Sequence, residues 1–109
     1  MSDVVFVDDS NFEAEVLNST VPVLVDFSAT WCGPCKRQLP LLEKFASENL
    51  STVKVCKIDI DDAPTVTAKL GIRSVPTLVL FNSGGIIGSK VGLTSFAEMS
   101  NFVLTKTGA

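Results

Sequence analysis

The sequence predicts an α/β fold in which a mixed sheet of about five strands carries helices on both of its faces. Strand-sized apolar runs alternate with segments of helical spacing, which favours parallel strand pairing through right-handed crossovers. Near the C-terminal end, Asn82-Ser83-Gly84-Gly85 separates two apolar runs and indicates a hairpin, which adds an antiparallel edge. The chain has 109 residues, 46% hydrophobic and 19% charged, so we expect one domain over residues 1–109.

The first half of the chain is expected to form three strands and two helices. We place the strands at residues 4–7, 21–27 and 53–59, and the helices at about 10–18 and 34–49. Ser10 and Glu13 have the spacing of a capping box, and Pro34 suits a first helical position. Pro40 lies inside the second helix and predicts a kink. Helical spacing indicates that this helix faces the core with Cys35, Leu39, Leu42 and Ala46.

The second half is expected to supply the hairpin and a closing helix. We place a helix at about 61–70, strands at 77–81 and 86–91, and the closing helix from 95 onward. Gly71 would end the first of these helices as its C-cap. Ser95 and Glu98 form a second capping-box pattern, after which Phe96, Met99 and Val103 would line the inner face.

Charge and the N-terminus exclude several classes of function. The net charge is −3 with acids and bases mixed, so no basic cluster exists that would follow a nucleic-acid backbone. The N-terminus lacks the basic start and long apolar run of a signal peptide, and its four-residue apolar run is too short to span a bilayer. We therefore expect a soluble, cytoplasmic protein that binds neither nucleic acid nor membrane.

Two of the three cysteines form a Cys-x-x-Cys pair, Cys32 and Cys35, placed where a buried strand ends and a helix begins. Unpaired N–H groups and the helix dipole stabilise a thiolate at such a position. In a reducing compartment the pair indicates catalysis or metal binding. The chain has no histidine, and three cysteines cannot supply four metal ligands, so we predict no metal site. Cys56, in an apolar strand, is interpreted as a small core residue, with a regulatory thiol as the alternative.

Several segments together resemble the thioredoxin family, and they cover nearly the whole chain in the family's order. They are Val25-Asp26-Phe27, Trp31-Cys32-Gly33-Pro34-Cys35-Lys36, Pro40, Lys57-Ile58-Asp59, Gly71-Ile72-Arg73-Ser74-Val75-Pro76-Thr77 and Lys90-Val91-Gly92. Ser28 departs from the pattern, because the family often has an aromatic residue there; Trp31 is thus the only tryptophan. Arg37-Gln38-Leu39 also differs from the usual apolar residues, and we expect this exposed helix face to influence partner choice.

The resemblance implies the thioredoxin fold and a protein-disulfide reductase that contributes to cell redox homeostasis. It makes Cys32 the nucleophile and Cys35 the resolving thiol, with no cofactor beyond this redox-active pair. Asp26, a carboxylate inside an apolar strand, would be the base for Cys35, since burial raises its pKa and no histidine is present. Lys57 in the next strand would tune Asp26. The implied partners are substrate proteins with disulfides and a separate thioredoxin reductase, and we expect a monomer.

Residues around the cysteines are expected to set the redox potential and to bind substrate. Gly33 and Pro34 carry no charge and would favour a reductant, because a histidine there would stabilise the reduced thiolate. Pro76 resembles the family's cis-proline, which would leave the N–H and C=O of Val75 free to pair with an extended substrate. An apolar docking rim would consist of Trp31, Val75, Pro76, Val91 and Gly92.

Other interpretations remain open from the residues alone. The fold could serve as a binding module with incidental cysteines, and a disulfide isomerase is the nearest enzymatic rival. Asp26 could reach water at the strand end, Lys57 could be a surface lysine, and the valines could be core residues. Replacing Cys32 with Ser separates a binding module from an enzyme, because binding would survive and reduction would not.

Overall fold

A computed structural model describes residues 3–108 as a five-stranded mixed sheet between helices, which confirms the expected fold class. The elements in chain order are β1 (Val5–Val7), η1 (Glu13–Leu17), β2 (Val23–Ser28), α1 (Gly33–Glu48), β3 (Lys54–Asp59), α2 (Pro64–Lys69), β4 (Thr77–Asn82), β5 (Gly85–Val91) and α3 (Phe96–Thr107). The strand order is β1-β3-β2-β4-β5. Strand β3 pairs in parallel with both β1 and β2, and β4 pairs antiparallel with β2 and β5.

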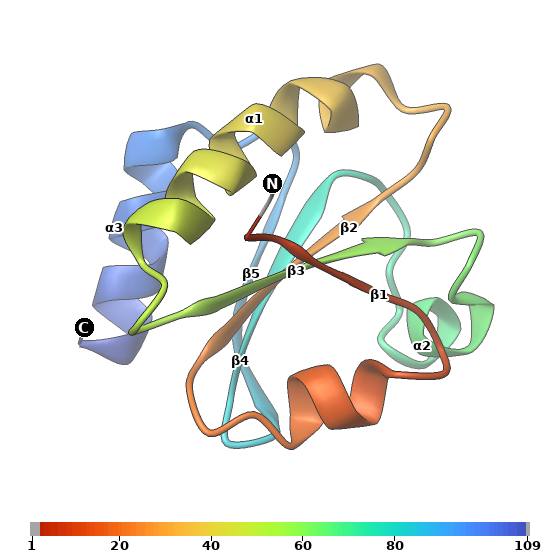
Figure 1. The fold of residues 1–109 in the computed structure, drawn as a ribbon. Helices are drawn as coiled ribbons and strands as arrows, with labels where there is room; N and C mark the ends of the chain where they lie inside the picture. The colour runs from red at the N-terminus through yellow and green to blue at the C-terminus, as the bar shows by residue number, and fades with distance from the viewer. Residues whose placement is uncertain (1–2, 109) are drawn as a thin grey trace.

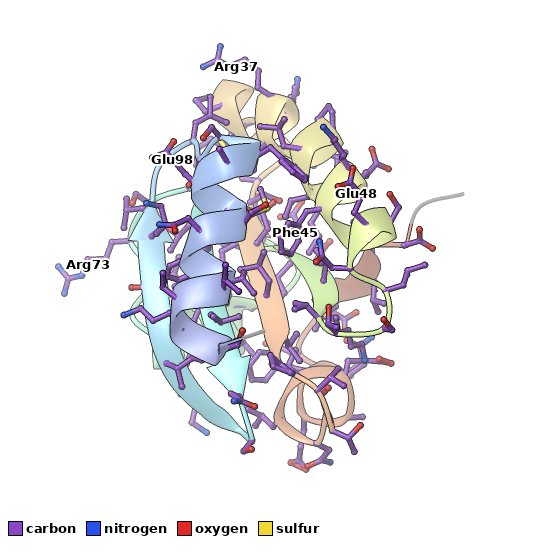
Figure 2. The ribbon with its side chains drawn as sticks, turned by 90° about the vertical axis from the view of Figure 1, so that its left-hand side faces the viewer. Arg37, Phe45, Glu48, Arg73 and Glu98 are labelled. Atoms are coloured by element: carbon purple, nitrogen blue, oxygen red, sulfur yellow. A yellow bond between two sulfur atoms is a disulfide. The ribbon has the colours of Figure 1, made fainter. Side chains whose placement is uncertain are left out.

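Helices cover both faces of the sheet, and within residues 3–108 an apolar core lies on each face. Figure 1 shows α1 and α3 on one side of the sheet and α2 with the short helix after β1 on the other. Phe45 lies between α1 and α3 in Figure 2 and packs with Leu42 and Met99 against the first face. Phe27 and Phe81 belong to the core on the second face. Every residue of β2 is buried, as its apolar sequence predicted.

The predicted capping box at Ser10 is wrong. The Asp8 carboxylate accepts hydrogen bonds from both the N–H and the hydroxyl of Ser10, and so the hydroxyl does not cap the following helix. That helix, η1, is a π-helix of five residues, and the N–H of Asn18 donates to the carbonyl of Glu13 at 2.9 Å. Local side-chain bonds of Asp and Ser compete with helix capping in this way.

The inward face of α1 also differs from the prediction. Gln38 is buried and Leu39 only half-buried, so the exposed face expected at Gln38 is wrong. The buried positions are Cys35, Gln38, Leu42, Phe45 and Ala46. From Cys35, the observed spacing of three, four and three residues fits a helical face as well as the predicted spacing of four, three and four. Because Gln38 is polar, the sequence favoured the wrong one of these two faces. The helix continues through Pro40, and the kink there stays a prediction.

Turns and caps in the second half agree with the sequence. Leu70 is the C-cap of α2, and Gly71, the next residue, has the φ of +68° that suits a glycine at the end of a helix. Between β4 and β5, Ser83 and Gly84 have φ values of 53° and 81°, which suits a two-residue hairpin turn. The capping box of Ser95 and Glu98 is formed in both directions at the start of α3.

Candidate active site

The sheet topology brings three separate segments to the edge where β2 ends. The chain leaves β2 at Ser28 and reaches Cys32 just before α1. Because β4 runs antiparallel to β2, its first residue Thr77 pairs with Phe27, near the end of β2. Thr77 also pairs with Val91, the last residue of β5. The cysteine pair, the segment before β4 and the segment after β5 therefore meet at one place.

The cysteine pair forms a disulfide at the N-terminus of α1. Cys32 and Cys35 are joined through their sulfurs with a Cα–Cα distance of 5.3 Å. Cys32 is the N-cap of this 16-residue helix, and its sulfur accepts a hydrogen bond from the N–H of Cys35 at 3.2 Å. Both residues are buried, with exposed fractions of 5% and 2%. This N–H and the helix dipole can stabilise a thiolate on Cys32 once the disulfide is reduced.

The peptide bond between Val75 and Pro76 is cis and faces the cysteines. The carbonyl oxygen of Val75 lies 3.7 Å from the sulfur of Cys32. Pro76 itself is buried, and its carbonyl accepts a hydrogen bond from the N–H of Gly92 at 2.8 Å. Trp31 and Val91 are exposed by 67% and 71%, and Val75 is half-buried. An apolar surface therefore borders the disulfide.

Asp26 is a buried carboxylate in the middle of the sheet. It lies in β2 between Lys57 of β3 and Leu78 of β4, and neither of its oxygens accepts a hydrogen bond from a described residue. Burial raises its pKa from 3.8 to about 7, and the charge of Lys57 opposes part of that rise. Such a pKa allows the carboxyl group to accept or release a proton near neutral pH.

Lys57 acts on Asp26 through its charge and forms no ion pair with it in the described part of the chain. Its ammonium group lies 5.4 Å from the centre of the Phe6 ring, in β1 on the opposite side of β3. Lys57 also lines a pocket of about 200 Å³ beside the inner cysteine. The pocket is bounded by Ala29, Thr30, Cys35, Lys36, Leu39 and Lys57. It is large enough for several water molecules next to Cys35.

The structure adds residues that sequence reasoning missed. The indole N–H of Trp31 donates to the Asp61 carboxylate at 3.1 Å, which ties the exposed ring to the loop before α2. The side chain of Gln38 pairs with the backbone of Thr94, two residues after Gly92. No local pattern signals the contact of Trp31 with Asp61. The regular spacing of Cys35, Gln38 and Leu42 could have indicated that Gln38 faces inward.

The remaining two positions singled out from the sequence are both buried. Ser28, the position that departs from the family pattern, is buried, and its hydroxyl donates to the Ile58 carbonyl at 3.5 Å. Cys56 forms no disulfide and is fully buried, which confirms it as a core residue, and burial raises its pKa to about 11. Within residues 3–108, no group of three or more His, Cys, Asp or Glu could hold a metal ion. No helix of this part is long and apolar enough to cross a membrane.

Comparison with known proteins agrees with this geometry. The family model described as thioredoxin matches residues 3–105. The chain belongs to the thioredoxin family. It is 41% identical to a thioredoxin of Haemophilus influenzae over 103 residues, and 45% identical to one of Acidithiobacillus ferridurans over 104 residues. Each alignment covers 94% of this chain and 96% of the relative. A thioredoxin of the alga Porphyra purpurea is 49% identical over 86 residues, which cover 79% of this chain and 80% of the relative.

Membership in the thioredoxin family gives the disulfide its chemical meaning. Thioredoxins are dithiol–disulfide oxidoreductases that work through their own cysteine pair, and this chain has that pair at disulfide distance. The protein is therefore an oxidoreductase whose redox-active centre is Cys32–Cys35.

Proposed function

We propose that this protein reduces disulfide bonds in substrate proteins, with Cys32 as the nucleophile and Cys35 as the resolving thiol. The observation that carries the proposal is the position of the disulfide, at the N-terminus of α1 and opposite the cis bond at Pro76. Gly33 and Pro34 add no charge that would stabilise the reduced form, so the pair favours reduction of its substrates.

In the first step the Cys32 thiolate attacks one sulfur of the substrate disulfide. A bond forms between the two sulfurs, the substrate disulfide breaks, and its electron pair leaves with the second substrate sulfur, which takes up a proton. The carbonyl of Val75, 3.7 Å from the Cys32 sulfur, lies where an extended substrate backbone could pair with it. Trp31, Val75, Val91 and Gly92 would contact the apolar side chains of the substrate, and the buried Pro76 would hold the backbone of this docking rim.

In the second step the Cys35 sulfur attacks the Cys32 sulfur, the mixed disulfide breaks, and its electron pair leaves with the substrate sulfur, which takes up a proton. The thiol of Cys35 is buried and must lose its proton first, which burial opposes. We assign that proton to the Asp26 carboxylate, whose pKa of about 7 suits the transfer, with water in the adjacent pocket as the carrier. Lys57 keeps enough of Asp26 ionised to act as a base.

Two electrons from a separate thioredoxin reductase would restore the dithiol. The sequence contains no glycine-rich nucleotide-binding motif that would allow direct reduction by a nicotinamide cofactor. We place the protein in the cytoplasm as a monomer. The reducing conditions there suit a chain whose third cysteine is a free thiol. Cell fractionation and sedimentation test these two assignments.

The proposal is tested by insulin reduction driven by dithiothreitol, which replaces the reductase. Cys32→Ser should abolish catalysis, and Cys35→Ser should accumulate a mixed disulfide that mass spectrometry detects. Asp26→Ala should slow turnover and release of the mixed disulfide between pH 6 and 8. Full activity of Cys32→Ser would reject the mechanism and favour a binding module. Parental rates for Asp26→Ala would reject the assigned base.

The direction of the reaction is tested by a redox titration in dithiothreitol buffers, with the free thiols alkylated and counted by mass spectrometry. A potential of about −270 mV, which is usual for thioredoxins, would identify a reductant. A potential of about −180 mV or above would identify an oxidant or isomerase instead.

A further inference from the structure

Gln38 connects the helix that carries Cys35 to a loop of the docking rim. It lies one helical turn after Cys35 and is completely buried. Its side-chain NH₂ donates to the carbonyl of Thr94 at 2.9 Å, and its side-chain oxygen accepts from the N–H of Thr94 at 2.8 Å. The side-chain amide of Gln38 thus pairs with both the N–H and the C=O of the buried Thr94, as the backbone of a neighbouring strand would.

The orientation of this amide is fixed by its partner. Exchanging the nitrogen and oxygen of Gln38 would place the NH₂ against the N–H of Thr94 and the oxygen against its carbonyl, so neither hydrogen bond could form. An aliphatic side chain would fill the same space but would leave the N–H and C=O of Thr94 without these bonds in the interior. Gln38 therefore holds one particular backbone arrangement at Thr94, in addition to filling space.

Thr94 passes this constraint to the segment that borders the disulfide, residues 91–94, called here the Gly92 loop. The hydroxyl of Thr94 donates to the Gly92 carbonyl at 3.2 Å, and the N–H of Gly92 donates to the Pro76 carbonyl at 2.8 Å. Gly92 has a φ of +94°, a conformation that other residues rarely adopt. The loop backbone is therefore tied to the cis-proline at one end and to α1 at the other.

The two apolar side chains of the Gly92 loop, Val91 and Leu93, point into solvent. Val91 is 71% exposed and Leu93 is 43% exposed, while Thr94 between Leu93 and Ser95 is buried. Two apolar side chains are thus held out to solvent on a fixed backbone beside the redox centre. A protein substrate would contact them, whereas a small disulfide needs to reach only the Cys32 sulfur.

We propose that Gln38 is a positioning residue that holds the Gly92 loop for protein substrates and thereby favours them over small disulfides. This inference rests on the proposed reductase function. It separates two properties of the site, because the loop would set the KM for a protein disulfide while the cysteines set the rate of exchange itself. Loss of the Gln38 bonds should therefore act on substrate binding and not on thiol reactivity.

The test compares two substrates, insulin and 5,5′-dithiobis(2-nitrobenzoate). Dithiothreitol supplies the electrons for insulin, and the reduced protein, prepared beforehand, supplies them for the small disulfide. Gln38→Met keeps the volume of the side chain and removes both bonds to Thr94. We expect the KM for insulin to rise about five- to tenfold with kcat nearly unchanged. The second-order rate with the small disulfide should stay within about twofold of the parental value.

Asn49→Ala is the matched control. It removes a side-chain bond of 2.8 Å to the Phe45 carbonyl near the opposite end of α1. We expect this variant to lose stability with no change in the ratio of the two substrates. If Gln38→Met does not fold, the same two substrates are compared with Gln38→Asn, whose amide is one methylene too short to keep both bonds to Thr94.

The outcomes distinguish the inference from the function beneath it. A parental KM for insulin in a folded Gln38 variant would overturn the role of Gln38. An equal loss with both substrates would also overturn it, because Gln38 would then act on the cysteines. Failure of the parental protein to reduce either substrate would instead reject the proposed function. Faster hydrogen exchange at the Thr94 amide in Gln38→Met, followed by NMR, would support the loosened loop independently of turnover.

Discussion

The carboxyl group of Asp26 destabilises the folded chain at the pH at which the proposed chemistry needs it. Its pKa is 3.8 in an exposed setting and about 7 in the folded protein. Below pH 3.8 both states are protonated, so Asp26 has no effect on stability. As the pH rises toward 7, only the unfolded chain gains by ionisation, and the free energy of unfolding falls by about 4 kcal/mol in total.

Asp26→Asn should therefore stabilise the oxidised protein at pH 8 by up to about 4 kcal/mol and leave it nearly unchanged at pH 4. Urea unfolding followed by circular dichroism at several pH values measures this difference. Asp62→Asn removes the same charge from an exposed position and is the control, with no comparable gain expected. A gain for Asp26→Asn that did not vary with pH would contradict the raised pKa.

Pro34 is the residue at which we expect the redox potential to respond most directly. It lies two residues after Cys32, the N-cap of α1, and has no N–H and no charge. In Pro34→His, an imidazolium beside Cys32 would stabilise the thiolate and hence the reduced state. We predict a potential higher by tens of millivolts, where about 30 mV is tenfold in the equilibrium constant. An unchanged potential, measured by thiol counting, would refute this reasoning.

The helix that closes the fold depends on its N-terminal cap. Ser95 accepts a hydrogen bond from the N–H of Glu98 at 3.1 Å, and the Glu98 carboxylate accepts from the N–H of Ser95 at 3.2 Å. Ser95→Ala should lower the free energy of unfolding by about 1 kcal/mol. Ser10 has the same sequence pattern but caps no helix. We therefore expect Ser10→Ala to lower the free energy of unfolding by less than half as much. Equal losses in urea unfolding would contradict the difference between the two sites.

Elements were predictable from the sequence where a single pattern dominates. The apolar run of β2, the Gly71 stop after α2 and the hairpin turn at Ser83 each depend on neighbouring residues alone. Predictions failed where two local solutions compete. The side chain of Ser10 had a choice between Asp8 and a helix N-terminus, and spacing in α1 allowed two faces that differ at Gln38. The local bond to Asp8 decided the first case, and a contact across the fold, between Gln38 and Thr94, accompanies the second.

At the scale of the whole molecule, resemblance to a family located the site, but only the fold shows how its parts meet. The pairing of Phe27 with Thr77 and of Thr77 with Val91 brings distant segments to the cysteines. The contact of Lys57 with Phe6 joins β3 to β1 and has no signal in local sequence. Such contacts depend on strand order and register, which the sequence specifies only through the complete sheet.

Cys56 makes the stability of the whole sheet measurable by chemistry. It lies in β3, between β1 and β2, and is fully buried with a pKa raised by that burial to about 11. After reduction, an excess of iodoacetamide should modify Cys32 first, the buried Cys35 more slowly, and Cys56 only when the sheet opens. Counting alkylated cysteines by mass spectrometry over time measures this. Rapid modification of three thiols in the folded protein would contradict the burial of Cys56 and support a regulatory thiol.

Trp31 gives the protein an optical property that follows from its position. The chain has one tryptophan and no tyrosine, so its near-ultraviolet absorption and emission come almost entirely from one ring beside the disulfide. That ring is 67% exposed and bonded to Asp61, outside both apolar cores. Its emission should therefore change with the oxidation state of the neighbouring sulfurs and with the arrival of a substrate. The other aromatic rings of the chain are seven phenylalanines, of which only Phe6 is exposed, so the interior would be nearly dark to the same light.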